Sequence, residues 1–310
     1  MKKHLVIFLL FIFSTSVAQE ETTYTSKEVT ISKHINGTLL TSIDANKPDL
    51  AILIAGYGPT DRDGNQNFLK TNNIKKLSIG LTKNGIATFR YDKRIVKQIR
   101  QNNVDKNLSF DDFVTDAIDV LDYFKNLNQY NKIYIVGHDQ GSLIGMLAAK
   151  DKADGFISIA GAGQTIDSVI IEQIEKTAPQ FTADTKRIFN ILKSGKTTTD
   201  YPVALSSIFN IETQRFFMSW MKHNPVDIIS TLNVPTLIIN GTKDLQVSEA
   251  EALLLKEAAK DASIKIIKNM NHVMVTIAGD DLENSKSYNE SQRPLADGLL
   301  EKIISFITSK

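Results

Sequence analysis

The sequence contains no cysteine among its 310 residues. A disulfide framework is therefore excluded, which fits an exported protein that relies on its buried core. A lipoprotein anchor requires a cysteine, so we expect none. The five histidines do not occur at the i, i+4 or clustered spacing of metal ligands, so we expect neither a metal nor another cofactor.

Neither sign of charge is in large excess: the sequence contains 36 basic and 35 acidic side chains. Lys2 and Lys3, the apolar run from Leu5 to Phe13 and the segment Ser16-Val17-Ala18 have the pattern of a signal peptide, with cleavage expected near Ala18. Its removal leaves 34 basic and 35 acidic side chains. No nucleic-acid footprint is visible, and the apolar run is too short to anchor the mature chain in a membrane. We expect an exported protein, periplasmic or extracellular.

Apolar strand-like runs alternate with helical patterns along the chain. The hydrophobic content of 42% is ample for one large domain. An opening hairpin, Glu28–Ser32 and Thr38–Ile43, is expected to turn at Asn36-Gly37, because this dipeptide favours tight turns. The expected later strands are Leu50–Ala55, Ile86–Tyr91, Ile133–Val136, Gly155–Ala160, Val234–Asn240 and Ile264–Lys268. This alternation predicts an α/β protein with a mostly parallel, doubly wound sheet.

Two segments between these strands are expected to be helical. Residues 110–126 place Phe113, Ala117, Leu121 and Phe124 on one face, which is typical of core packing. Residues 164–232 occupy the position of a helical cap that roofs a cleft and selects the substrate. The α/β core is then made of residues 19–163 and 233–310. The aromatic residues of the cap are expected to pack there, namely Tyr201, Phe209, Phe216, Phe217 and Trp220.

The segment Gly137-His138-Asp139-Gln140-Gly141 joins a predicted strand to a predicted helix. This is the pattern of a nucleophile elbow, with aspartate at the position that serine normally occupies. Gly137 and Gly141 permit the sharp turn. The alternative is that Asp139 only caps the following helix.

Two later residues complete a possible catalytic set. Asp244 and His272 each follow a predicted strand, so both are expected at the edge of the sheet where ligands bind. Asp139, Asp244 and His272 occur in the chain order of an α/β-hydrolase nucleophile, acid and histidine. The backbone N–H groups of Tyr57 and Gln140 are placed to form an oxyanion hole.

The chain resembles bacterial α/β-hydrolases of the EstD-type esterase and serine-aminopeptidase-like family. The motifs that carry the resemblance are Ala55–Asn65, Arg90–Arg94, Gly137–Met146, Gly241–Ser248 and Met270-Asn271-His272. The resemblance implies an α/β-hydrolase fold with a helical cap, and hydrolysis of ester bonds in small molecules.

The sequence departs from the family pattern in three ways. The family has serine where Asp139 stands, typically followed by an acidic residue where Gln140 stands. It usually has a small residue in place of Tyr57, and glycines and a serine in place of Ile95–Gln98. These changes cluster around the elbow and its facing loop, which indicates an evolved alteration of the site.

Aspartate changes the chemistry that the elbow can perform. A carboxylate that attacks an ester must expel an alkoxide that is more basic by ~12 pKa units, or ~16 kcal/mol, so the adduct collapses backwards. In one alternative His272 and Asp244 activate water directly against a bound ester, with low activity. In another, Asp139 attacks an epoxide carbon and water hydrolyses the resulting ester, with Tyr57 or Tyr201 as proton donor.

Three further possibilities complete the set. Dehalogenation is disfavoured, because Gln140 stands where haloalkane dehalogenases of this fold have a tryptophan. Ser142 is a poor substitute nucleophile, since a first-turn helix residue normally points away from the cleft. The last alternative is a pseudoenzyme that holds a ligand without turnover; the retained Asp244 and His272 speak mildly against it.

Overall fold

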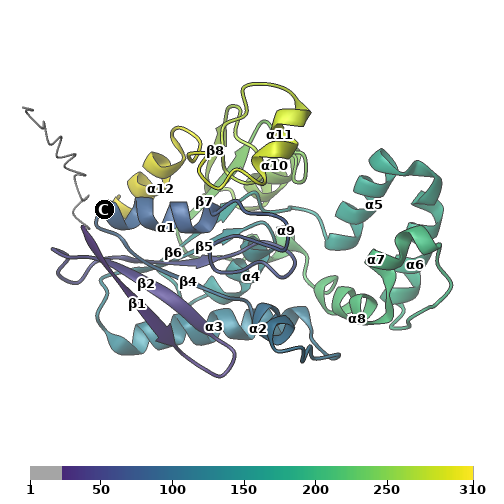
Figure 1. Ribbon diagram of the computed structural model, residues 1–310, viewed down its shortest axis with the longest axis horizontal. Helices are drawn as coiled ribbons and strands as arrows, with labels where there is room; N and C mark the ends of the chain where they lie inside the picture. The colour runs from purple at the N-terminus through teal and green to yellow at the C-terminus, as the bar shows by residue number, and fades with distance from the viewer. Residues whose placement is uncertain (1–22, 310) are drawn as a thin grey trace, which may run out of the picture.

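A single eight-stranded sheet forms the centre of the computed structural model, which describes residues 23–309 (Figure 1). The predicted signal peptide, with its cleavage near Ala18, lies outside the described residues. The strand order is β1-β2-β4-β3-β5-β6-β7-β8. Only the pairs β1–β2 and β2–β4 are antiparallel. The strands are β1 (Tyr24–Thr30), β2 (Asn36–Ser42), β3 (Leu50–Ile54), β4 (Ala87–Tyr91), β5 (Ile133–His138), β6 (Gly155–Ile159), β7 (Thr236–Gly241) and β8 (Ser263–Ile267).

Helices cover both faces of the sheet, and alternate strand residues pack toward the two layers (Figure 1). Along β3, Ala51 and Leu53 belong to one buried cluster, together with residues of α1 (Asn73–Lys83) and α12 (Leu299–Thr308). Ile52 and Ile54 belong to the opposite cluster. That cluster includes residues of α3 (Phe110–Leu127), α4 (Gln140–Ala149), α9 (Pro225–Ile229) and α10 (Glu249–Ala258). This arrangement confirms the predicted α/β class and the mostly parallel sheet.

The segment between β6 and β7 is helical. It contains α5 (Ile166–Thr177), α6 (Thr182–Lys193), α7 (Ser206–Phe209) and α8 (Ile211–Trp220), with 3₁₀ turns at Pro179–Phe181 and Val203–Leu205. These helices lie at one end of the molecule, beyond the sheet (Figure 1). Trp220 stacks on Phe110 of α3 with ring centroids 5.4 Å apart, which attaches this segment to the core. The exact boundaries of the cap stay a prediction.

The expected turn of the opening hairpin is wrong. The chain turns at Ser32–Ile35, where the N–H of Ile31 donates to the carbonyl of Ile35. Asn36 and Gly37 instead begin β2. A side chain at Gly37 would collide with the ring of Phe89, so this glycine provides room for an aromatic side chain of the neighbouring strand β4. Close packing against β4 thus overrides the local turn preference of Asn-Gly.

The remaining predicted elements agree with the structure to within a few residues. The helix expected over residues 110–126 is α3, and its predicted apolar face is buried. Two short helices, α2 (Arg94–Arg100) and α11 (Asp281–Ser287), complete the fold. No helix within residues 23–309 has both the length and the apolarity that a membrane crossing needs.

Candidate active site

Asp139 occupies the sharp turn between β5 and α4. Its backbone has φ 51° and ψ −120°, a conformation that residues other than glycine rarely adopt. The turn brings α4 close to β3: a Cβ on Gly141 would lie 2.3 Å from the carbonyl oxygen of Ile54. A Cβ on Gly137 would lie 2.1 Å from the carbonyl oxygen of Gly141. Both glycines predicted for the elbow are therefore required by close backbone approach.

The Asp139 carboxylate does not cap its own helix. Its Oδ2 accepts a hydrogen bond of 2.7 Å from the backbone N–H of Tyr57, in the loop after β3. The helix-cap interpretation of Asp139 is therefore wrong. The strained backbone directs the carboxylate toward the loop that was expected to supply an oxyanion-hole donor.

His272 lies beside Asp139 and is held by Asp244, as the chain order predicts. Its Nδ1 is 2.9 Å from Oδ2 of Asp244, whose side chain is fully buried, and its Nε2 is 4.0 Å from Oδ2 of Asp139. The other oxygen of Asp244 accepts from the N–H groups of Gln246 and Val247. Since both oxygens of Asp244 are occupied, it fixes the imidazole with Nε2 toward Asp139.

The two carboxylates set the protonation of the imidazole. Burial lowers the pKa of His272, but Asp244 and Asp139 outweigh burial and raise it to about 9. Near neutral pH His272 is therefore the positively charged imidazolium, with a proton on each ring nitrogen. It becomes a base when the pH exceeds this pKa, or when the charge on Asp139 is removed.

His138 supports the loop that carries His272. Burial, and the neighbouring charge of His272, lower the pKa of His138 to about 4, so its ring is neutral. Its Nε2 lies 2.8 Å from the carbonyl oxygen of His272 and must donate to it. This role was not predictable from the sequence, because no local pattern links the two histidines.

A cavity of about 210 Å³ opens in front of Asp139 and His272. Tyr57, Gln246 and Tyr288 are also part of its wall. The hydroxyl of Tyr288 accepts from Gln246 Nε2 at 2.8 Å, so its own proton is available to the cavity. Burial raises the pKa of Tyr288 and keeps it neutral. Tyr288 follows α11, and sequence reasoning missed it.

Lys93 lies behind the elbow and is only 2% exposed. Its ammonium group donates to the carbonyl of Gly56 and, at 3.2 Å, to Oε1 of Gln140. Burial lowers the pKa of Lys93 to about 7, although Asp139 opposes this shift. Lys93 thereby joins the Gly56–Tyr57 loop to the first residue of α4, the two segments predicted to supply oxyanion donors.

Other polar residues of interest lie away from the reacting groups. Arg62 pairs with Glu28 and Asp92, and Asp63 pairs with Arg90, so both tie their loop to the strands. Ser142 is buried, with its hydroxyl 2.7 Å from that of Ser158. Tyr201 packs against the main buried cluster and is absent from the wall of the cavity, so it is not the proton donor considered from the sequence.

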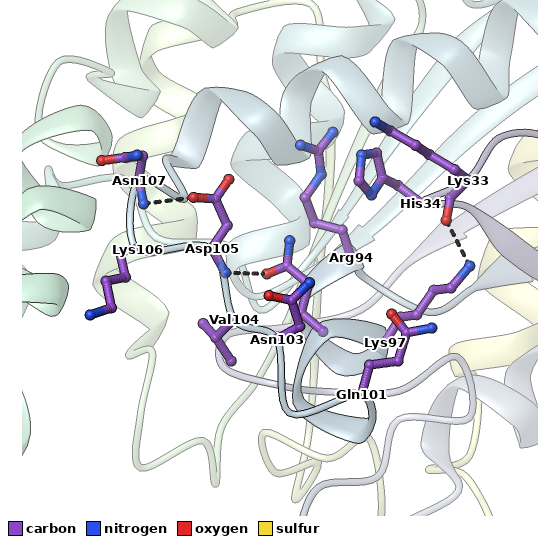
Figure 2. A pocket seen from close by; sticks show the side chains of 11 residues that line it. Lys33, His34, Arg94, Lys97, Gln101, Asn103, Val104, Asp105, Lys106 and Asn107 are labelled. Carbon is purple, nitrogen blue, oxygen red and sulfur yellow. Dashed lines mark hydrogen bonds between the residues drawn. The ribbon is translucent and has the colours of Figure 1, made fainter.

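A larger cavity, of about 700 Å³, lies beside α2 and is separate from the elbow (Figure 2). Two of its basic groups have partners: Lys97 donates to the carbonyl of Lys33, and Arg94 pairs with Asp112 and Asp116. It contains none of the predicted catalytic residues. The candidate site is therefore the smaller cavity at Asp139.

The sheet order, the elbow between β5 and α4 and a histidine after β8 define an α/β-hydrolase. Residues 71–276 match the family model described as serine aminopeptidase, S33. The chain belongs to this hydrolase family. It is also 26% identical over 237 residues to esterase EstD of Thermotoga maritima, covering 74% of this chain and 55% of EstD. The chain thus spans about half the length of this relative.

Solved structures share the fold. Est1E from Butyrivibrio proteoclasticus is similar with a TM-score of 0.57 and 18% identity, over 91% of this chain and 95% of Est1E. The α/β-hydrolase GrgF from Penicillium sp. sh18 is similar with a TM-score of 0.55 and 12% identity, over 92% of this chain and 97% of GrgF. At these identities the likeness concerns the fold alone.

Proposed function

We propose that the protein is a hydrolase that cleaves an ester bond with water activated by His272. The observation that carries this proposal is the His272–Asp244 pair, 2.9 Å apart, with Nε2 on the side of Asp139. Membership of the S33 family and the similarity to an esterase support the ester as the bond that is cleaved. The substrate is a small molecule held in the cavity at Asp139.

In the direct route, water attacks the carbonyl carbon of the substrate ester and transfers a proton to Nε2 of His272. The tetrahedral adduct then breaks its bond to the alkoxy oxygen, which takes this proton and leaves as the alcohol. Asp244 keeps the imidazole oriented and stabilises its charge. The pKa of about 9 leaves little neutral His272 near pH 7, so this route is slow there and accelerates as the pH rises toward 9.

Hydrolysis of a short p-nitrophenyl ester by the wild type, Asp139→Ala and Asp139→Ser tests this route. We expect Asp139→Ser to be the most active, because a serine completes a nucleophile–histidine–aspartate set on this scaffold. The wild type is expected to show low activity that depends on His272. A wild-type rate far above that of Asp139→Ser would contradict our argument that aspartate disfavours acyl transfer.

The hydrogen bond from Tyr57 favours a second candidate, in which the ester that is hydrolysed forms on Asp139 itself. With Oδ2 held by the Tyr57 N–H, the other carboxylate oxygen attacks an epoxide carbon and the carbon–oxygen bond of the ring breaks. The released alkoxide takes a proton in the cavity, where the His272 imidazolium and the Tyr288 hydroxyl are available.

The second half of this route uses the same geometry. Alkylation removes the charge of Asp139, which lowers the pKa of His272 and makes it a base for water. Water attacks the Asp139 carboxyl carbon and gives a proton to His272, and the negative charge develops on Oδ2, where the Tyr57 N–H already donates. The bond from this carbon to the alkylated oxygen then breaks, and the product leaves as a diol with the proton from His272. The oxyanion donor thus serves the enzyme's own ester.

A single-turnover reaction in ¹⁸O-labelled water, with styrene oxide as substrate and enzyme in excess, tests the second route. The new hydroxyl oxygen of the product comes from Asp139, so we expect an unlabelled diol and an ¹⁸O label in the peptide that contains Asp139. A labelled diol with an unlabelled peptide would indicate direct attack by water. Absence of turnover with esters and epoxides alike would favour a ligand-binding protein.

We also propose that the mature protein is exported. The support is the signal-peptide pattern of residues 1–18.

A further inference from the structure

One peptide group of the oxyanion loop is held at both of its polar ends. The N–H of Tyr57 donates to Oδ2 of Asp139 at 2.7 Å, and the carbonyl of the same peptide, which belongs to Gly56, accepts from the ammonium of Lys93. The contacts therefore run from a cation through a single peptide to a carboxylate. A cation at the carbonyl oxygen draws electron density from the nitrogen, so the N–H becomes a stronger donor and the two hydrogen bonds reinforce each other.

The surrounding contacts fix this peptide in place. The carbonyl of Tyr57 accepts from Thr60 Oγ1 at 2.7 Å and from Gln66 Nε2 at 2.8 Å, which holds the next peptide of the loop. A Cβ on Gly56 would lie 2.8 Å from Oδ2 of Asp139. A side chain at residue 56 would thus push the carboxylate away from the Tyr57 N–H. The loop is built for close approach of this peptide to the carboxylate.

Lys93 carries a buried charge without a carboxylate in contact. The side chain is 2% exposed, and its ammonium lies 5.5 Å from the centre of the Phe113 ring. Within residues 23–309 its hydrogen bonds go only to the carbonyl of Gly56 and to Oε1 of Gln140. Burying an ammonium without an ionic partner is costly, so stability does not explain this lysine. Lys93 is not part of the wall of the Asp139 cavity, and it therefore acts on the site through the groups that it holds.

We propose that Lys93 is a positioning residue whose ammonium polarises the Gly56–Tyr57 peptide and so strengthens the hydrogen bond from the Tyr57 N–H to Asp139. Its role in catalysis rests on the proposed function, in which negative charge develops at this N–H, on Oδ2 of Asp139 or on the carbonyl oxygen of a bound ester. The strengthened donor stabilises that charge more than the neutral ester that precedes it, so it accelerates the hydrolytic step.

The proton resonance of the Tyr57 amide tests the proposal without turnover. Protein labelled with ¹⁵N-tyrosine gives one backbone signal for each of its eight tyrosines, and Tyr57→Phe identifies the signal of residue 57 by its loss. Burial lowers the pKa of Lys93 to about 7, so raising the pH through this value removes the charge. We expect the Tyr57 amide proton to move upfield in that interval, because its hydrogen bond weakens.

Controls assign this titration step to Lys93. The neighbouring histidines titrate elsewhere, since burial lowers the pKa of His138 to about 4, and the two carboxylates, against burial, raise that of His272 to about 9. Lys93→Met keeps the length of the side chain and removes the charge, so it is expected to abolish the step. Lys97→Met is the matched control. It also removes a lysine that donates to a backbone carbonyl, that of Lys33, and is expected to keep the step.

Turnover gives a second readout. Lys93→Met is expected to lower kcat roughly tenfold, the value of one hydrogen bond. KM is expected to stay unchanged, because Lys93 does not line the cavity. The sequence contains no cysteine, so Lys93→Cys can be unfolded, alkylated at its single thiol and refolded. Alkylation with bromoethylamine restores an ammonium and is expected to recover kcat and the titration step. Bromopropane adds an uncharged chain of the same length and is expected to recover neither.

A wild-type Tyr57 amide signal that does not move as Lys93 loses its proton would overturn the proposal, and this result needs no variant. An equal step in Lys93→Met would also overturn it, because another group would then be the source. An unchanged kcat in Lys93→Met would overturn the role in catalysis. If the step depends on Lys93 but neither an ester nor an epoxide is hydrolysed, the polarised peptide stands and the proposed function fails.

Discussion

Replacing His272 with glutamine is expected to lower the rate of product formation by about 10²–10⁴-fold, the usual contribution of a positioned general base. Both routes depend on this residue, because water must lose a proton to Nε2 whether the ester is the substrate or forms on Asp139. The measurement is steady-state turnover of a p-nitrophenyl ester and of styrene oxide. His34→Gln, in the turn between β1 and β2, is the matched control and is expected to retain wild-type rates.

The same variant separates the two routes. Loss of the base slows hydrolysis of an alkylated Asp139, whereas its formation retains the Tyr288 hydroxyl as a proton donor, so the peptide that contains Asp139 is expected to gain the mass of styrene oxide. The direct route forms no such adduct. Full activity of His272→Gln would contradict both routes, and His272 would then not be the catalytic base.

The fold followed from local patterns in the sequence. Buried parallel strands read as continuous apolar runs, and each was visible between helices with one apolar face. The residues at the carboxyl ends of β5, β7 and β8 necessarily meet at one edge of the sheet. Topology alone therefore brings Asp139, Asp244 and His272 together, and the structure contains this cluster; their catalytic roles stay predictions.

Features that depend on side-chain approach in three dimensions were not predictable. Lys93 was noted only as part of a charged motif, and nothing nearby in the sequence shows that its ammonium is buried between Gly56 and Gln140. Tyr288 follows α11 in a segment that no motif covers. The misplaced turn at Asn36-Gly37 has the same origin, because the ring of Phe89 that fills the space over Gly37 comes from a distant strand.

The Tyr57–Asp139 hydrogen bond also lay beyond the sequence. The order of motifs placed a donor near residue 57 and a carboxylate at residue 139 but did not show that they bond. This contact changes the balance between the two routes: a substrate carbonyl oxygen would have to displace Oδ2 of Asp139 from the donor, whereas an ester on Asp139 would use it in place. Of the two proposed routes, only the second uses this donor without displacing Oδ2.

Replacing Gly141 with alanine is expected to destabilise the protein by about 3 kcal/mol, because overpacking at a tightly packed position costs about 1–3 kcal/mol or more. The added Cβ would lie 2.3 Å from the carbonyl oxygen of Ile54 and 2.8 Å from that of Ala55, both backbone atoms of a central strand region that cannot rotate away. To relieve the contact, α4 must move from β3. The measurement is the free energy of unfolding in urea.

Gly279→Ala is the matched control for this experiment. Gly279 is exposed, and an added Cβ there would meet only the carboxylate oxygen of Glu283, the far end of a flexible side chain, at 2.7 Å. We expect a change within about 0.5 kcal/mol, as for most surface substitutions.

The shift of α4 in Gly141→Ala also moves Gln140 from Lys93 and Asp139 from Tyr57, so activity should fall even at temperatures where the variant is fully folded. Wild-type stability and activity in Gly141→Ala would mean that the elbow does not depend on close contact between α4 and β3.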